Sequence, residues 1–334
     1  MDSPDITTDH YLSYDLGSEV IMYSKNIDEE IAPASITKIM TALVLLDYFD
    51  FDDNITTSLP EDYVYDGKVA YIESGTIVTT EDLLELLLIY SANDAAYAAA
   101  MAVSGDIESF VEKMNIKATS FGMNDTYFLN PDGLDEYGHK TSLRDLLTLS
   151  LKFIENYKLV AITSKSSFSS NVSGIEKVYK STNQIIDRGF IGIKTGWTSQ
   201  AGLTFIGLKT EDSRQILTIV NKSIVNNDKT NHFIDTQILY EESFNNFGYF
   251  ENISISQPLY NIRNSNNQIT ITSSDPWVDF LNKSNSFPID LINYSNNRLS
   301  FSNTISDKEV RLNTSTYEVL WKFNLLEIFS FFAN

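Results

Sequence analysis

Two residues in the first part of the chain have the types and the spacing that nucleophilic catalysis needs. Ser35 and Lys38 are three positions apart, so a helix would place them on one face. A serine hydroxyl is a weak nucleophile until a base removes its proton, and a lysine whose pKa is lowered by burial and a neighbouring cation can be that base. The pair therefore predicts an activated serine, although a lone match of this kind also fits a capping serine with a solvated lysine.

Two further segments carry polar groups that could complete such a site. Ser91-Ala92-Asn93 interrupts an apolar helical stretch, where a hydroxyl and an amide need polar partners. In a cleft, the serine would relay a proton and the amide would hold a substrate amide. Lys194-Thr195-Gly196 ends a predicted strand, where Gly196 leaves room for a ligand backbone and the other two face a carboxylate or a proton relay. Taken alone, the first segment also fits a helix break, and the second also fits a strand that ends in a turn.

The elements that must position these groups follow from the periodicity of apolar residues. The run from Ser35 to Leu46 is apolar almost all round, which predicts a buried helix. Residues 160–185 are polar and predict an irregular segment. The other expected elements are strands at 11–14, 20–23, 190–194, 203–207 and 215–220, and helices at 83–90, 94–103, 107–119, 141–155 and 231–247.

The composition limits the classes of protein that this chain can be. Its 334 residues have a formal charge of −21 and no cysteine. Disulfides and thiolate metal sites are therefore excluded, and such an acidic surface argues against a nucleic-acid partner. The character changes near residue 250, so we expect a first domain at 1–250 and a small β-rich domain at 251–315. The apolar segment 316–334 is either a docked terminal helix or an amphipathic anchor at a membrane surface.

The three polar segments together, in this order, resemble the motifs of the serine penicillin-recognising enzymes. The chain is most similar to the low-molecular-mass D-Ala-D-Ala carboxypeptidases, which are penicillin-binding proteins of serine peptidase family S11, over roughly residues 9–250. The stretches that carry the resemblance are Pro33–Ala42, Leu129–Asp135 followed by His139 and Asp145, and Gly192–Thr198 followed by Ala201-Gly202.

The resemblance implies an α/β fold of the β-lactamase/transpeptidase type, an antiparallel sheet flanked by helices, with a small C-terminal β-rich domain. It implies that Ser35 attacks a peptide carbonyl and that Lys38 is its general base. By the same resemblance, Ser91 and Asn93 would complete the proton network and hold the peptide, and Lys194 and Thr195 would face its terminal carboxylate. The backbone N–H groups of Ser35 and Trp197 would form the oxyanion hole. Gly196 lies between these residues and is also expected to contact the substrate.

One position departs from the family pattern. The family has an arginine early in the helix that follows the second hairpin strand, and this arginine helps to hold the substrate carboxylate. Here His232 occupies that place, with Lys229 nearby. We therefore expect His232 or Lys229 to contribute to substrate binding in its stead.

The resemblance also implies the reaction, its partners and its location. The enzyme would remove the terminal D-alanine from peptidoglycan pentapeptides through an acyl-enzyme, with β-lactam antibiotics as covalent inhibitors and without a metal or an organic cofactor. The family works outside the cytoplasmic membrane, in the periplasm or at the cell surface. The N-terminal residues Met-Asp-Ser-Pro-Asp show no basic or apolar export signal.

The sequence supports several other functions less well. Class A β-lactamases deacylate with a glutamate past the second motif, whereas this chain has no glutamate between Glu112 and Glu136. A Ser-His-Asp hydrolase is not supported, because there is no Gly-x-Ser-x-Gly turn and His139 is expected to be structural. No histidines are paired at helical spacing for a metal. A serine β-lactamase and a non-catalytic wall-binding protein of the same fold remain as alternatives.

Overall fold

The computed structural model describes residues 3–253 and six further strands at 258–264, 267–273, 277–282, 290–295, 298–302 and 307–314. Two compact units divide the chain, Met1–Asn245 and Asn246–Asn334. The domain boundaries predicted near residues 250 and 315 stay predictions. The segment 316–334, predicted as a terminal helix or a membrane-surface anchor, lies outside the described residues.

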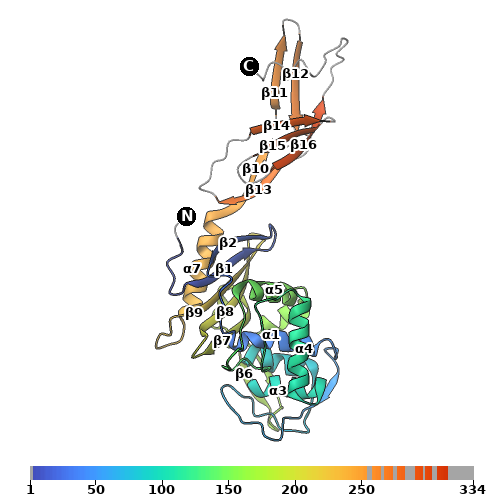
Figure 1. Ribbon diagram of the computed structural model, residues 1–334, viewed down its shortest axis with the longest axis vertical. Helices are drawn as coiled ribbons and strands as arrows, with labels where there is room; N and C mark the ends of the chain where they lie inside the picture. Colours follow the sequence, from blue (N-terminus) through green and yellow to red (C-terminus); the bar gives the residue numbers. More distant parts are fainter. Residues whose placement is uncertain are drawn as a thin grey trace. The chain divides into compact units, whose positions relative to one another are not determined.

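A five-stranded antiparallel sheet is the centre of the first unit (Figure 1). Its strand order is β2-β1-β9-β8-β7, so β7 is an edge strand. The strands are β1 (His10–Asp15), β2 (Val20–Lys25), β7 (Phe190–Thr198), β8 (Gly202–Glu211) and β9 (Arg214–Ser223). The middle strands β8 and β9 are buried along most of their length, because elements cover both faces of the sheet there.

Helices flank this sheet on both sides, which gives the α/β fold that the sequence predicted (Figure 1). Helix α7 lies along one face, and α1, α3, α4 and α5 gather on the other side. All nine residues of α1 are buried, as its apolar character predicted. The helices are α1 (Thr37–Leu45), α2 (Thr80–Glu85), α3 (Asn93–Ser104), α4 (Ile107–Ser120), α5 (Leu143–Ile154), α6 (Tyr157–Thr163) and α7 (Asn231–Asn246).

The structure corrects three local predictions. Residues 160–185 are not irregular throughout, because α6 extends to Thr163 and β5 (Ser167–Ser170) pairs with β6 (Lys177–Lys180). Burial explains that hairpin, since Phe168 and Tyr179 stack with ring centroids 5.3 Å apart. Strand β7 does not end at Gly196, because pairing with β8 continues to Thr198. Helix α1 begins at Thr37, after a 3-10 turn over Ala34–Ile36.

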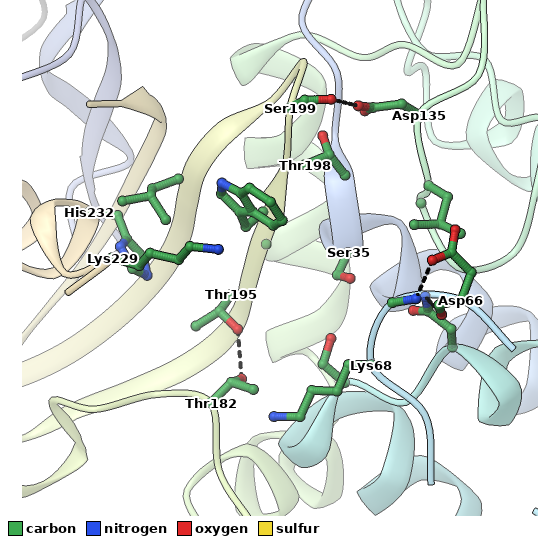
Figure 2. Close-up of a pocket in the computed structure, with 18 of the residues that line it drawn as sticks. Ser35, Asp66, Lys68, Asp135, Thr182, Thr195, Thr198, Ser199, Lys229 and His232 are labelled. Atoms are coloured by element: carbon green, nitrogen blue, oxygen red, sulfur yellow. Dashed lines mark hydrogen bonds between the residues drawn. The ribbon is translucent and has the colours of Figure 1, made fainter. Parts of the chain in front are cut away.

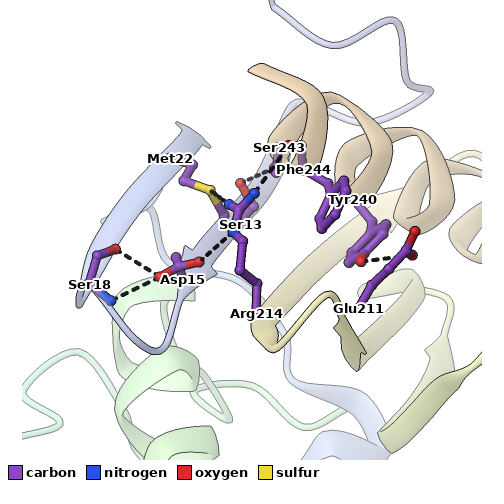
Figure 3. Close-up of polar contacts among 9 residues, drawn as sticks. All are labelled: Ser13, Asp15, Ser18, Met22, Glu211, Arg214, Tyr240, Ser243 and Phe244. Atoms are coloured by element: carbon purple, nitrogen blue, oxygen red, sulfur yellow. Dashed lines mark hydrogen bonds and ion pairs between the residues drawn. The ribbon is translucent and has the colours of Figure 1, made fainter. Parts of the chain in front are cut away.

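Buried polar contacts hold α7 and the start of β9 against the β1–β2 hairpin (Figure 3). Ser243 donates a hydrogen bond to Ser13 at 2.7 Å. The guanidinium of Arg214 lies 3.3 Å from a carboxylate oxygen of Asp15 and also donates to the carbonyl of Phe244 at 3.1 Å. Because Asp15 is 1% exposed, this ion pair lies inside the protein, where removing one partner is costly.

The second unit is rich in β-strands, as predicted. One pair consists of β10 (Phe247–Ile253) and β13 (Trp277–Asn282). A five-stranded sheet has the order β11-β12-β16-β15-β14. Its strands are β11 (Pro258–Asn264), β12 (Asn267–Ser273), β14 (Asp290–Ser295), β15 (Arg298–Ser302) and β16 (Asp307–Thr314). Within the described part of the chain, no helix has the length and apolar character needed to cross a membrane.

Candidate active site

Ser35 lies in the 3-10 turn that leads into α1 and is only partly buried, whereas its neighbours Ala34 and Ile36 are buried. The loop around Gly133 packs directly against this turn. A Cβ on Gly133 would come within 1.9 Å of the Ala34 carbonyl oxygen, and the φ of Gly133 is +88°, so only glycine fits there. The loop thus holds the turn in place, and Ser35 lines a cavity.

The Lys38 amine reaches Ser35 from the next turn, as the three-residue spacing predicted. Its Nζ lies 3.0 Å from Ser35 Oγ, 2.7 Å from Asn93 Oδ1 and 2.6 Å from the Asp132 carbonyl oxygen. Three acceptors thus match the three hydrogens of the ammonium group. When the amine loses one proton, the same nitrogen can accept the proton of the Ser35 hydroxyl.

Burial makes this deprotonation of Lys38 possible near neutral pH. Lys38 is fully buried, and this lowers its pKa from 10.5 to about 8, although Asp132 and Asp94 act in the opposite direction. At pH 7 a lysine with this pKa is neutral in roughly one molecule in ten. The side chain therefore fits a general base better than a permanent cation.

The second motif lies where one helix ends and the next begins. A π-helical turn, Leu86–Tyr90, leads into Ser91, which adopts a left-handed conformation with φ +69°. A non-glycine residue in this conformation is strained and is often held at functional sites. Asn93 begins α3, accepts a hydrogen bond from Lys38 and donates one to the Asp66 carbonyl at 2.9 Å. The interruption seen in the sequence thus brings Ser91 and Asn93 into the site.

The third motif extends the same network. Lys194 is buried, and its Nζ donates to Ser91 Oγ at 2.7 Å and to the Thr195 carbonyl at 2.9 Å. Its pKa is well below the usual range, because it is buried and because Lys38 and Lys68 are cationic neighbours. Lys194 thus lies beside Ser91, in the position of a proton relay. The Thr195 hydroxyl donates to Thr182 at 2.6 Å.

Gly196 brings β7 against the 3-10 turn that carries Ser35. A Cβ on Gly196 would come within 3.0 Å of the Ala34 Cβ and 3.2 Å of the Ser35 nitrogen. A side chain at this position would therefore collide with the turn, and Gly196 also lines the cavity, where the predicted place for a ligand backbone stays a prediction. Among the described strands β7 pairs with β8 alone, so its other edge can pair with an extended peptide.

The cavity at this edge has a volume of about 750 Å³ (Figure 2). Trp197 and Lys229 form part of the wall beside β7, and the Lys229 Nζ lies 3.6 Å from the centre of the Trp197 ring. His232 also lines the cavity but is buried, which lowers its pKa to about 4, so it is neutral at pH 7. Its Nδ1 has no hydrogen-bond partner among the described residues. Lys68 lines the opposite wall (Figure 2).

Several residues of the site had no role in the sequence analysis. The buried carboxylate of Asp94 accepts hydrogen bonds from the backbone of Ala70 and Ile72, and it thereby holds the loop that carries Asp66 and Lys68. Thr182 comes from the segment predicted to be irregular. Acids are common in the first turn of any helix, so the position of Asp94 gave no signal of this function.

His139 has the structural role that was predicted. It is buried between α1 and the loop that follows residue 128. One ring nitrogen accepts from the Leu129 N–H at 3.2 Å, and the other lies 3.0 Å from the Thr37 hydroxyl. Burial lowers its pKa to about 4, so the ring is neutral at pH 7. The described residues contain no group of three or more histidine and carboxylate side chains that could hold a metal.

Comparisons with known proteins agree with this geometry. A family model described as D-alanyl-D-alanine carboxypeptidase matches residues 1–223. The carboxypeptidase DacF of Bacillus subtilis is 34% identical over 189 residues, which are 54% of this chain and 48% of that protein. The chain therefore spans about half the length of this curated relative.

Solved structures share the fold. Penicillin-binding protein D2 of Listeria monocytogenes, in its cefotaxime-bound form, is 26% identical with a TM-score of 0.64 and covers 73% of this chain and 100% of its own. The carboxypeptidase DacD of Francisella tularensis has a TM-score of 0.74, covers 94% of both chains and is 18% identical, which shows the likeness of fold alone.

Proposed function

Because the chain belongs to the D-alanyl-D-alanine carboxypeptidase family, we propose that it is a serine-type D-Ala-D-Ala carboxypeptidase acting on peptidoglycan pentapeptides. The observation that carries the proposal is the arrangement around the nucleophile. The Ser35 hydroxyl lies 3.0 Å from a buried lysine amine whose pKa is lowered to about 8. A second buried lysine, Lys194, lies 2.7 Å from the Ser91 hydroxyl beside it.

The reaction follows in two steps from these groups. The neutral Lys38 amine takes the proton of Ser35 as its oxygen attacks the carbonyl carbon of the last peptide bond. The backbone N–H groups of Ser35 and Trp197 would stabilise the oxyanion. The bond to the leaving D-alanine then breaks, and its nitrogen receives a proton through Lys38, Ser91 and Lys194. Water attacks the resulting ester with the same base, which releases the shortened peptide and restores Ser35.

The peptide itself is held along the edge of β7 in this proposal. Asn93 and the backbone of β7 would bind peptide groups, and Thr195 would face the terminal carboxylate. The structure describes no arginine in the lining of the cavity, whereas Lys229 lies on the same wall as Trp197. Because His232 is neutral at pH 7, Lys229 would supply the positive charge and His232 at most a neutral hydrogen bond.

Two further parts of the proposal concern inhibitors and location. The solved Listeria protein is described with cefotaxime bound, and we propose that β-lactams likewise acylate Ser35 here. A peptidoglycan substrate would place the protein outside the cytoplasmic membrane. Residues 316–334, which lie outside those described, could attach the protein to the membrane surface, as the sequence analysis predicted for one of two cases.

The test measures D-alanine release from a synthetic pentapeptide together with the intact mass after incubation with a penicillin. We expect release of D-alanine and one penicillin adduct per chain, and the loss of both in Ser35→Ala with an unchanged circular dichroism spectrum. Release that persists in Ser35→Ala would show that another nucleophile acts. An adduct that hydrolyses within seconds, without D-alanine release, would indicate a β-lactamase, and no adduct and no release would indicate a non-catalytic protein.

A further inference from the structure

Thr182 lines the active-site cavity from the short segment between β6 and the 3-10 turn Ile186–Arg188, and it has no part in the reaction described above. Its hydroxyl group contacts the hydroxyl group of Thr195 on the neighbouring strand β7 (Figure 2). Thr195 is the residue that would face the terminal carboxylate of the substrate. Thr182 therefore contacts a group that would bind the substrate.

Thr182 connects two of the three motifs through hydrogen bonds. Its backbone N–H donates to the carbonyl of Ile89 at 3.0 Å, and its hydroxyl donates to the same carbonyl at 3.4 Å. Ile89 belongs to the π-helical turn that leads into Ser91. The Thr182 hydroxyl also accepts a hydrogen bond from the Thr195 hydroxyl at 2.6 Å. Thr182 thus joins the turn before Ser91 to the strand that carries Thr195.

The backbone that carries Thr182 is fixed by the next residue, Asn183, which is 9% exposed. The Asn183 side chain donates to the Phe190 carbonyl at 2.9 Å and accepts from the Ile185 N–H at 3.0 Å. A Cβ on Gly192 would come within 2.7 Å of the Asn183 amide nitrogen, so β7 packs closely against this side chain. The fold therefore holds the Thr182 hydroxyl beside β7.

The direction of the two hydroxyl hydrogen bonds matters, because a hydroxyl group has only one hydrogen to donate. In this structure the Thr195 hydroxyl donates to Thr182, and the Thr182 hydroxyl donates to the Ile89 carbonyl. Thr195 then presents only lone pairs to the cavity. A carboxylate has acceptors alone and needs a donor, so this arrangement is not the one that binds a carboxylate.

Reversal of one hydrogen bond removes this conflict. Each hydroxyl can donate or accept, so Thr182 can donate to Thr195 while Thr195 donates to the carboxylate. The Ile89 carbonyl then loses the longer of its two hydrogen bonds from Thr182 and keeps the N–H bond at 3.0 Å. Because the carbonyl keeps a donor, the reversal costs little, and a hydroxyl that accepts a hydrogen bond donates its own more strongly.

We propose that Thr182 is a positioning residue for substrate binding: its hydroxyl donates to Thr195 in the complex and thereby directs the Thr195 hydrogen to the terminal carboxylate. This role rests on the proposed carboxypeptidase function and deepens it. Selectivity for a free carboxylate would then come from two hydroxyls in series as well as from the charge of Lys229. Because Thr182 acts through Thr195, its loss should weaken ligands with a terminal carboxylate more than ligands that lack one.

The test compares a tripeptide that ends in D-Ala-D-Ala with the same peptide as its C-terminal amide. Their dissociation constants are measured by calorimetry on the Ser35→Ala protein, so that hydrolysis does not interfere. The ratio of the two constants reports how strongly the site prefers the carboxylate. In this background Thr182→Val, which replaces the hydroxyl with a methyl group of similar size, should reduce the preference about fivefold, the effect of one hydrogen bond.

Two further variants separate positioning from a purely structural role. Thr182→Ser keeps the hydroxyl and should keep the preference of the Ser35→Ala protein. Thr163→Val in α6 is the matched control, because it removes a buried hydroxyl that donates to the Val160 carbonyl at 3.2 Å and does not line the cavity. If Thr182 only held the fold together, Thr182→Val would weaken both peptides equally. A preference that stays unchanged or rises in Thr182→Val would therefore overturn the inference.

Kinetics on the protein with Ser35 intact give a second measurement. Thr182→Val should raise KM for D-alanine release about fivefold with a smaller change in kcat, whereas Thr182→Ser should retain both values. An unchanged KM would overturn the role of Thr182 while D-alanine release, and hence the proposed function, stands. Absence of release would count against the proposed function instead. Calorimetry would then still decide, because a Ser35→Ala protein without any preference for the carboxylate would overturn the inference independently of activity.

Discussion

In the proposed reaction, the pH dependence of acylation follows from the buried lysine beside Ser35. Only the neutral Lys38 amine can take the proton of Ser35, and its pKa is lowered to about 8 by burial. The neutral fraction rises from about 1% at pH 6 to about half at pH 8, so the rate of acylation should rise about fiftyfold over this interval and level off above it. Stopped-flow measurement with a fluorescent penicillin at a series of pH values gives this profile.

Asp132 provides the perturbation that identifies the titrating group. Its carboxylate acts to raise the pKa of Lys38, so Asp132→Asn should move the midpoint of the profile below that of the wild type. Asp52→Asn, a matched change at an exposed site, should leave the midpoint in place. A rate that is flat between pH 6 and pH 8, or a midpoint that rises in Asp132→Asn, would refute the assignment of Lys38 as the base.

Two further predictions concern the carboxylate and the fold. Lys229→Met should raise KM for the pentapeptide about tenfold with a smaller change in kcat. The reason is that a charge on the cavity wall is lost while the catalytic groups stay in place. An unchanged KM would mean that Lys229 does not hold the carboxylate. Arg214→Met should lower the free energy of unfolding in urea by about 3 kcal/mol, because the buried ion pair with Asp15 is lost; a loss below about 1 kcal/mol would show that the pair contributes little.

Most elements of the first unit could be predicted from the periodicity of apolar residues. The buried helix after Ser35, the Ala-rich helix after Asn93 and the hairpin near the N-terminus all lie where the pattern indicated. The predictions failed where pairing or packing with distant residues determines the extent of a strand. Strand β7 passes through Gly196 because β8 pairs with it, and Tyr179 forms part of a strand because Phe168 packs against it.

The sequence also indicated which residue types form the site, but not which group each of them contacts in the fold. The types and order of the three polar segments indicated a serine activated by a lysine. The sequence placed Lys194 opposite a substrate carboxylate or in a relay, and the folded chain brings it to Ser91. It put His232 at the carboxylate, with Lys229 nearby as the alternative, and burial makes the histidine neutral. Asp132 was one residue of a matching stretch, with no role of its own.

The sequence by itself determined the contact between Ser35 and Lys38, the proposed nucleophile and base, because the two residues are neighbours on one local structure and their spacing brings them together. Only the tertiary structure decided the pKa of Lys38, since that value depends on burial by elements far apart in the chain and on the opposing charges of Asp132 and Asp94. A second cavity beside the site is also decided by the tertiary structure, because the residues that line it lie as far apart in the chain as Pro60 and Leu134. Local spacing sets local contacts, whereas burial and electrostatic fields arise only when distant segments come together.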